Sequence, residues 1–287
     1  MTAIYKRELK NYLTSLTGYL FIFFILFVTG IYFTYYQIMN AYPRMEYTMS
    51  AVTFVFLIGV PLLTMRVIAE ERKQKTDQLL LTAPVPVRQI VFGKYLALIT
   101  VFFIPMAIIS IYPLLLLSYG DISLKSTYTA IIGFFLLGCA DMAVGMFISS
   151  ITESQVISAV LTFVLLFAFY MMSGISGFFS QNAISTCIAF CILILAAVWI
   201  LYMMIKNIWI CLTAATAGIL AVILLFLKNS VSFEGGIQKV LDAFNMTSYF
   251  ESFVNNIMDL KGIVYFLSII AVFLFLTEQS IQKRRWS

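Results

Sequence analysis

The chain has 287 residues, of which 62% are hydrophobic and 11% are charged, and its formal net charge is +5. Soluble domains are about 45–50% apolar and about 25% charged, so this composition excludes a soluble globular protein and predicts an all-α, polytopic bundle of membrane helices. The chain contains no histidine, which removes the commonest general base and disfavours a metal site.

The first sixteen residues have the pattern of an amphipathic helix. Apolar and aromatic side chains recur at helical spacing on one side, and basic side chains gather largely on the other. The first set is Tyr5, Leu9, Tyr12 and Leu16, and the second is Lys6, Arg7 and Lys10. We expect residues 1–16 to lie along the inner leaflet as an interfacial helix; the alternative is a frayed tail whose charges only orient the chain.

The rest of the chain, residues 17–287, is expected to form a single transmembrane domain. A bilayer core about 30 Å thick needs about 20 apolar residues per helix. Eight such runs occur, at 17–37, 48–65, 94–117, 127–150, 155–173, 184–205, 207–227 and 262–280. With a cytoplasmic N-terminus, most of the 18 lysines and arginines fall on one side. The positive-inside rule therefore predicts a multi-pass protein of the plasma (inner) membrane with both termini cytoplasmic, and the net charge gives no reason to expect a nucleic-acid partner.

Residues 66–93, between the second and third predicted spans, carry a dense block of charge. Thr76 followed by Asp77 is a helix N-cap with an acid in the first turn. Pro84 ends that short helix, and Pro86 fits the first turn of the next one. The pattern predicts a helix descending from the membrane, a short leucine-bearing helix and a sharp return. On spacing alone, the segment fits an ordinary positively charged loop equally well.

The fourth predicted span contains a carboxylate, Asp141. A charge inside a span costs about 2.5–3.5 kcal/mol on insertion scales, so it needs an explanation. Gly138, Gly145 and Ser149 share its helical face, and such small residues allow close approach of another helix or line a polar path. Two interpretations follow: Asp141 lies on a translocation path, or it is hydrogen-bonded between helices and structural.

Further features lie in the second half of the chain. Gly174 and Gly177, near the outer end of the fifth span, are candidates for an outer gate made by a helix break or a re-entrant turn. Residues 228–261 are expected outside the membrane, where two amphipathic patterns fit short helices on the outer surface or capping the bundle. The four cysteines lie within predicted spans, which favours packing over disulfides, and no metal site is predicted.

Three stretches resemble the ABC-2 type exporter permeases. The stretch AEERKQKTDQLLLTAPVPVRQIVFGKYLA resembles their first cytoplasmic loop, in which a Glu-Glu pair, a Thr, a Leu-Leu-Leu-Thr run, a proline and a Gly-Lys recur at this spacing. GMFISSITESQVISAV resembles their junction between the fourth and fifth spans. YFESFVNNIMDLKGIVYFLSIIAVFLFLT, followed by KRRW, resembles the closing segment of the subgroup that includes gliding-motility and nitrous-oxide-reductase-maturation permeases. Two departures are Lys75, where the family usually has glycine, and the spans at 184–205 and 207–227, which exceed the family's six-span pattern.

The resemblance implies that the short cytoplasmic helix is a coupling helix that docks on an ATP-binding subunit. The candidate coupling residues are then Glu70, Glu71, Thr76, Asp77, Leu80 and Pro84. Glu153 and Gln155, in the turn after the fourth span, are candidates for a second contact with the ATPase, with a solvated helix end as the alternative. A second permease copy or a related permease, in the lipid bilayer, is implied as a further partner.

The chain itself is not expected to hydrolyse ATP. That reaction requires a G-x-x-x-x-G-K-[ST] phosphate loop, whereas Gly93-Lys94 lacks the upstream glycine and is followed by Tyr95. No cofactor is expected on this chain, because ATP and magnesium belong to the partner subunit. The expected function is that of an exporter's permease subunit, for a lipid, a peptide or a hydrophobic small molecule. The alternatives are a non-transporting scaffold driven by an ATPase and an ion-coupled carrier that uses Asp141.

Overall fold

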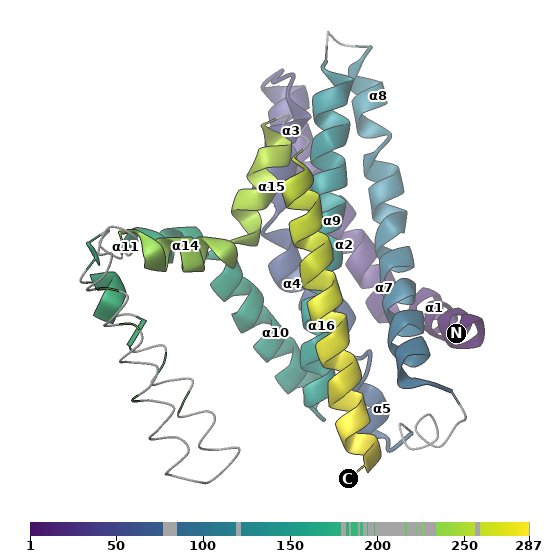
Figure 1. Ribbon diagram of the computed structural model, residues 1–287. Helices are drawn as coiled ribbons and strands as arrows, with labels where there is room; N and C mark the ends of the chain where they lie inside the picture. Colours follow the sequence, from purple (N-terminus) through teal and green to yellow (C-terminus); the bar gives the residue numbers. More distant parts are fainter. Residues whose placement is uncertain are drawn as a thin grey trace. The chain divides into compact units, whose positions relative to one another are not determined.

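A computed structural model of the protein describes residues 1–76, 85–118, 122–178, 234–255 and 259–286, with a few short runs and single positions between 182 and 226 (Figure 1). Every regular element in these parts of the chain is helical, which confirms the predicted fold class. In chain order the helices are α1 (Thr2–Thr14), α2 (Leu16–Phe33), the π-helix η1 (Thr34–Met39), α3 (Met45–Val52), α4 (Val55–Thr64), α5 (Ala69–Lys73), α7 (Val87–Ile109), α8 (Tyr112–Leu116), α9 (Leu124–Ile151), α10 (Gln155–Tyr170), α11 (Met172–Phe178), α14 (Gly236–Ala243), α15 (Met246–Val254) and α16 (Leu260–Trp286).

Several of these helices are long and apolar enough to cross a bilayer. Within the described residues they are the four segments Leu16–Met39, Val87–Leu116, Leu124–Ile151 and Leu260–Arg284, and a fifth candidate is the pair Met45–Val52 and Val55–Lys73, which is bent by 55°. The expected number of eight spans is not confirmed. One reason is that α10 has only 16 residues and ends at Tyr170. The expected spans at 184–205 and 207–227 fall largely outside the described residues.

The chain divides into two compact units. Unit 1 comprises Met1–Ala168 and Met246–Ser287, and unit 2 comprises Phe169–Asn245. In unit 2, α11 packs with α14, Ile237 is buried, and the rings of Phe169 and Phe244 stack at a centroid distance of 6.4 Å.

Helix α9 forms the centre of unit 1 and contacts α3, α4, α7, α15 and α16. Aromatic rings fill the contacts among α4, α7 and α9. The ring centroid of Phe56 on α4 lies 4.5 Å from that of Phe134 on α9 and 5.7 Å from that of Phe102 on α7. Gly138 makes this packing possible, since a Cβ there would lie 2.6 Å from the Phe102 ring. The core is therefore a set of interlocking rings around one helix with small residues on its surface.

The expected amphipathic helices of the segment 228–261 correspond to α14 and α15. The two differ in what they bury. Helix α15 packs on α9 and α16, and its buried side chains are Met246, Phe250 and Phe253. A Cβ on Gly133 of α9 would lie 2.7 Å from Phe253, so α15 is a packed part of unit 1 and not a helix resting on a lipid surface.

Candidate coupling site

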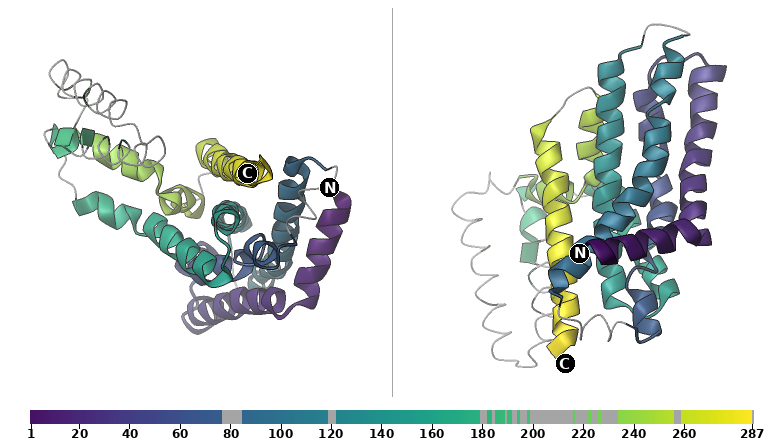
Figure 2. Two further views of the ribbon diagram at one scale, coloured as in Figure 1. Left: turned by 90° about the horizontal axis from the view of Figure 1, so that it is seen from below. Right: turned by 90° about the vertical axis from the view of Figure 1, so that its right-hand side faces the viewer.

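Helix α1 lies across the lower part of α7 (Figure 2, right) and packs tightly against it. Gly93 permits this approach, because a Cβ at that position would lie 3.3 Å from Ile4 and from the carbonyl oxygen of Met1. The buried residues of α1 are Glu8 and Tyr12, whereas Leu16 begins α2 and is 80% exposed. The buried side of α1 thus includes Tyr12 of the expected apolar face, half-buried Tyr5 and Leu9, and in addition a carboxylate, Glu8.

That carboxylate meets a buried lysine. Lys94 follows Gly93 on α7 and its side chain is only 2% exposed. Its ammonium donates to Glu8 Oε1 at 3.1 Å and to the carbonyl oxygen of Val67 at 2.9 Å, and it lies 3.0 Å from Glu71 Oε1. Lys94 thus joins α1, α7 and α5, three helices that are far apart in sequence.

Arg7 adds a second cation to these two carboxylates. Its Nη2 donates to Glu8 Oε1 at 2.7 Å and to Glu71 Oε1 at 2.8 Å. We call Arg7, Glu8, Glu71 and Lys94 the Lys94 cluster. Its members carry two positive and two negative charges, so the buried lysine is compensated, as a buried charge requires.

The electrostatics of Glu8 follow from this arrangement. Burial alone would raise the pKa of Glu8, but the charge of Lys94 and the hydrogen bond from Arg7 outweigh it and hold the pKa below its usual value. For Arg7, burial lowers the pKa less than Glu8 and Glu71 raise it. Both groups are therefore held in their charged forms.

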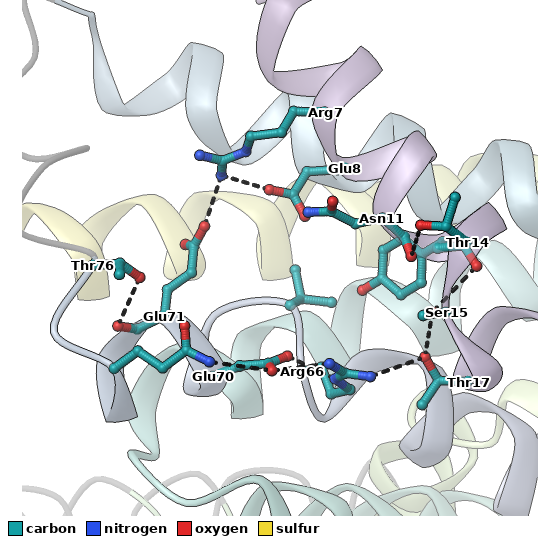
Figure 3. Close-up of a pocket in the computed structure, with 13 residues that line it drawn as sticks. Arg7, Glu8, Asn11, Thr14, Ser15, Thr17, Arg66, Glu70, Glu71 and Thr76 are labelled. Atoms are coloured by element: carbon teal, nitrogen blue, oxygen red, sulfur yellow. Dashed lines mark hydrogen bonds and ion pairs between the residues drawn. The ribbon is translucent and has the colours of Figure 1, made fainter.

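A second ion pair, between Arg66 and Glu70, lines the same cavity as Arg7, Glu8 and Glu71. Arg66 Nε donates to Glu70 Oε2 at 2.6 Å, and its Nη1 reaches Thr17 Oγ1 at 3.4 Å. Between this pair and the Lys94 cluster lies a cavity of about 750 Å³ (Figure 3). Its walls come from α1, the start of α2 and the segment 66–76, so the cavity lies beside α5.

Helix α5 is fixed at both ends although it has only five residues. At its start, the N–H groups of Ile68 and Ala69 both donate to Ser149 Oγ of α9 at 3.1 Å. At its end, Lys75 N–H donates to the Arg72 carbonyl at 3.1 Å. Thr76 N–H donates to the Glu71 carbonyl at 3.0 Å, which completes a Schellman motif.

Lys75 has a φ of +58°, the left-handed conformation that favours glycine. The departure from the family's usual glycine therefore falls at the one position of this turn where glycine would be favoured. The turn keeps its geometry with lysine in place, because the helix end is tied by both hydrogen bonds.

Comparison with known families bears on this site directly. The model of the family described as ABC-2 family transporter protein matches residues 2–284 of the chain. The chain belongs to this family. A comparison with curated proteins gives no match. As an ABC-2 family protein with several apolar helices, it is a multi-pass transmembrane permease subunit of an ABC transporter, a class that works with a separate ATP-binding subunit.

The structure describes half of the permease's candidate coupling residues. Glu70 and Glu71 lie on α5 with side chains 25% and 18% exposed, and both are engaged within the chain. Thr76 Oγ1 donates to the Glu71 carbonyl at 3.3 Å. The other candidates, Asp77, Leu80 and Pro84, lie outside the described residues.

The path candidates of the permease occupy the surface of α9. Gly145 packs against the side chain of Thr64, Gly138 packs against Phe102, and Ser149 caps α5. Asp141 is 7% exposed, and no hydrogen bond from the described part of the chain reaches its carboxylate. Three of the four thus have structural contacts, and Asp141 differs from them.

The remaining candidates lie on other elements than the members of the Lys94 cluster. Glu153 is 74% exposed and lies 3.4 Å from Arg284 near the end of α16. Gln155 begins α10. Gly174 and Gly177 lie in α11, separated from α10 by a turn at Met171, and a Cβ at either glycine would meet open space.

The centre of the site is not evident from the amino-acid sequence. Arg7 belongs by its spacing to a basic helix face, and neither Glu8 nor Lys94 has an assigned role there. A signal was present, since Lys94 stands within a long apolar helix and a buried lysine needs a partner. The partners could not be identified, because Glu8 and Lys94 are 86 residues apart.

Proposed function

We propose that this permease exports a hydrophobic or amphipathic cargo across the plasma membrane, with both termini in the cytoplasm, and that a separate subunit hydrolyses the ATP. The observation that carries the proposal is the Lys94 cluster, which ties the helix leading into the cytoplasmic loop to α1 and α7. A loop anchored in this way transmits force to the spans instead of absorbing it.

In this proposal the coupling residues divide into two groups. Asp77, Leu80 and Pro84 contact the ATP-binding subunit, following the family resemblance of the loop. Glu70 and Glu71 hold α5 in position through Arg66 and the Lys94 cluster, which agrees with their low exposure. Movement of the docked loop would then displace α5, and with it α7 and α9, since Ser149 and Lys94 link α5 to both.

The cargo class and the assembly follow from composition and family. The chain has 16% aromatic and only 11% charged residues, so a path through it suits a lipid, a peptide or a hydrophobic small molecule. Two membrane subunits, identical or related, would flank the path. The closing segment supports a place near the gliding-motility and nitrous-oxide-reductase-maturation permeases.

Affinity purification in mild detergent, followed by mass spectrometry, tests the proposal. The wild-type chain is expected to recover an ATP-binding subunit, and a Thr76→Pro, Leu80→Asp variant is expected to lose it. Recovery of no ATPase after cross-linking would contradict the proposal. ATP-dependent accumulation of cargo in inside-out vesicles then separates an exporter from a scaffold that uses the ATPase mechanically.

Asp141 favours a second candidate function, an ion-coupled carrier. A buried carboxylate without a hydrogen bond from the described residues is typical of ion-coupled transport. For a carrier, transport would persist without ATP and collapse with the ion gradient, and Asp141→Asn would abolish it. For an exporter, transport requires ATP.

A further inference from the structure

A second polar cavity, of about 480 Å³, lies at the opposite end of α9 from Ser149. It is formed where α3 begins, where α9 begins and where α15 ends. Its polar and aromatic lining consists of Arg44, Glu46, Tyr47, Ser123, Ser126 and Asn255. We call it the Glu46 cavity. All of its walls belong to unit 1, so its shape is set within one compact body.

Glu46 is buried and only partly satisfied. The residue is 5% exposed. Thr127 Oγ1 donates to its Oε1 at 3.4 Å, whereas Oε2 is buried and has no hydrogen-bond partner among the described residues. An unsatisfied oxygen of a buried carboxylate is costly, so a polar group of this kind in a cavity wall indicates a missing donor.

A cation at the same cavity does not supply that donor. Arg44 is exposed, and its guanidinium lies over the Tyr47 ring at 6.0 Å from the centroid. It pairs with no carboxylate in the described parts of the chain, Glu46 included. The cavity therefore presents one negative and one positive group that are two residues apart and do not neutralise each other.

A ligand that satisfies both groups carries a cationic N–H donor and an anion close together. Glu46 Oε2 requires a hydrogen-bond donor, so a primary ammonium fits and a quaternary ammonium, which has no N–H, does not. Arg44 suits a phosphate, which the guanidinium binds with fixed geometry. The hydroxyl groups of Ser123 and Ser126 add further polar contacts at the wall.

The position of the cavity identifies the source of such a ligand. It lies at the start of α9, a candidate membrane span, and at the start of α3, which belongs to the bent pair that is a further candidate. The end of an apolar span is where lipid headgroups are expected. The exposed tyrosines Tyr42 and Tyr47, each 41% exposed, adjoin it, as expected of residues at a membrane interface. Both features favour a membrane lipid over a dissolved amine.

We propose that the Glu46 cavity binds the headgroup of an amine-bearing phospholipid, with the primary ammonium on Glu46 and the phosphate on Arg44. Binding at this site requires neither the ATPase nor transport. It therefore stands or falls separately from the proposed export function.

Native mass spectrometry of the purified full-length chain tests this proposal. The chain is presented with equal amounts of phosphatidylethanolamine, phosphatidylcholine and phosphatidylglycerol of identical acyl chains. We expect selective retention of phosphatidylethanolamine. Glu46→Gln keeps an oxygen that accepts from Thr127 but removes the charge. It should lower this retention about tenfold, or about 1.4 kcal/mol, because a hydrogen bond to an ionised acceptor is stronger than one to a neutral amide.

Glu251→Gln is the matched control, since Glu251 is an exposed carboxylate on α15 that does not line the cavity, and it should retain the lipid as the wild type does. Equal retention of the ethanolamine and choline lipids by the wild-type chain would overturn the proposal without any variant. Unchanged selectivity in Glu46→Gln would overturn it as well. If free phosphoethanolamine at equal concentration displaced the lipid completely, the assignment to a membrane lipid would be wrong.

Discussion

Lys94 has a side chain that is 2% exposed and lies within 3.1 Å of two carboxylates from different helices. Burying one uncompensated charge costs several kcal/mol. The lysine is tolerated because Glu8 and the Val67 carbonyl accept hydrogen bonds from it and Glu71 forms an ion pair with it. Since Arg7 also contacts both carboxylates, the loss of any one member leaves the others unbalanced.

Lys94→Met therefore tests the cluster at the level of one residue. The substitution preserves the length of the side chain but leaves Glu8 and Glu71 with Arg7 alone. We expect the free energy of unfolding in detergent to fall by about 3–5 kcal/mol, the usual effect of breaking a buried pair. Lys125→Met, at an exposed lysine of α9, should change it by less than about 0.5 kcal/mol. Equal effects of the two variants would show that the cluster contributes nothing.

Glu8 gives the cluster a defined pH dependence. Its pKa is lower in the folded protein than in the unfolded chain, where it is about 4.3. The contribution of Glu8 to stability is therefore full above the unfolded pKa and is lost as the pH falls through the folded pKa. We expect Glu8→Gln to destabilise the protein at pH 7 and to make progressively less difference below about pH 4. Unfolding measured across this range checks the prediction, which a constant difference would contradict.

At the scale of elements, α5 depends on contacts made by other segments. Five residues do not form a stable helix alone, since nucleation is costly. Ser149 satisfies two N–H groups at its start, and the Schellman motif at Lys75 ties its end. Helix α5 is thus held by α9 through Ser149 and by the Lys94 cluster through Glu71.

Lys75→Gly should strengthen this helix end. Glycine adopts φ near +58° without the cost that a Cβ imposes, about 1–2 kcal/mol, although its greater freedom in the unfolded chain offsets part of the gain. We expect a net stabilisation of about 0.5–1 kcal/mol, measured by slower hydrogen exchange at Thr76. Gln74→Gly is the control: Gln74 has an ordinary right-handed conformation, so glycine there should destabilise.

The contact between α9 and α4 requires a residue without a Cβ at position 145. A Cβ at Gly145 would overlap the side chain of Thr64, whereas a Cβ at Gly30 of α2 would meet nothing within 4 Å. Gly145→Ala should therefore destabilise by about 1–3 kcal/mol. Gly30→Ala should be neutral or stabilising by up to about 1 kcal/mol, because alanine has the higher helix propensity. The thermal unfolding temperatures of the two variants test this. A lower temperature for Gly145→Ala alone would show that close packing, and not helix propensity, requires glycine at position 145.

In the whole molecule, the anchoring of α5 should affect transport more than folding stability when the entire charged cluster is replaced. Replacing all charges of a buried cluster together is often nearly neutral for folding, unlike removing one. In a Lys94→Met, Glu8→Gln, Glu71→Gln variant we expect the fold to be retained and the ATPase partner to stay bound. Cargo moved per ATP hydrolysed should fall, because α5 is no longer held to α1 and α7. An unchanged ratio would show that the Lys94 cluster is purely structural.

The family and the helical class could be predicted from the chain alone because they rest on local signals. Apolar runs of about 20 residues show periodicity and length directly, and the loop motif carries its spacing within 30 residues or so. The amphipathic character of α1 was also visible, but the burial of Glu8 was not. Its partner Lys94 and the glycine that lets α1 approach, Gly93, lie about 90 residues along the chain.

Composition and spacing, which are properties of the chain, are enough to predict an all-helical membrane protein with a charged loop between apolar segments. Which charges meet becomes evident only in the folded protein. By spacing, Arg7 belongs to a basic helix face, and Glu71 is a candidate contact for the ATP-binding subunit. Within the chain the two side chains pair with each other. The physical reason is that the cost of burying Lys94 is met by residues whose proximity arises only when α1, α5 and α7 pack together.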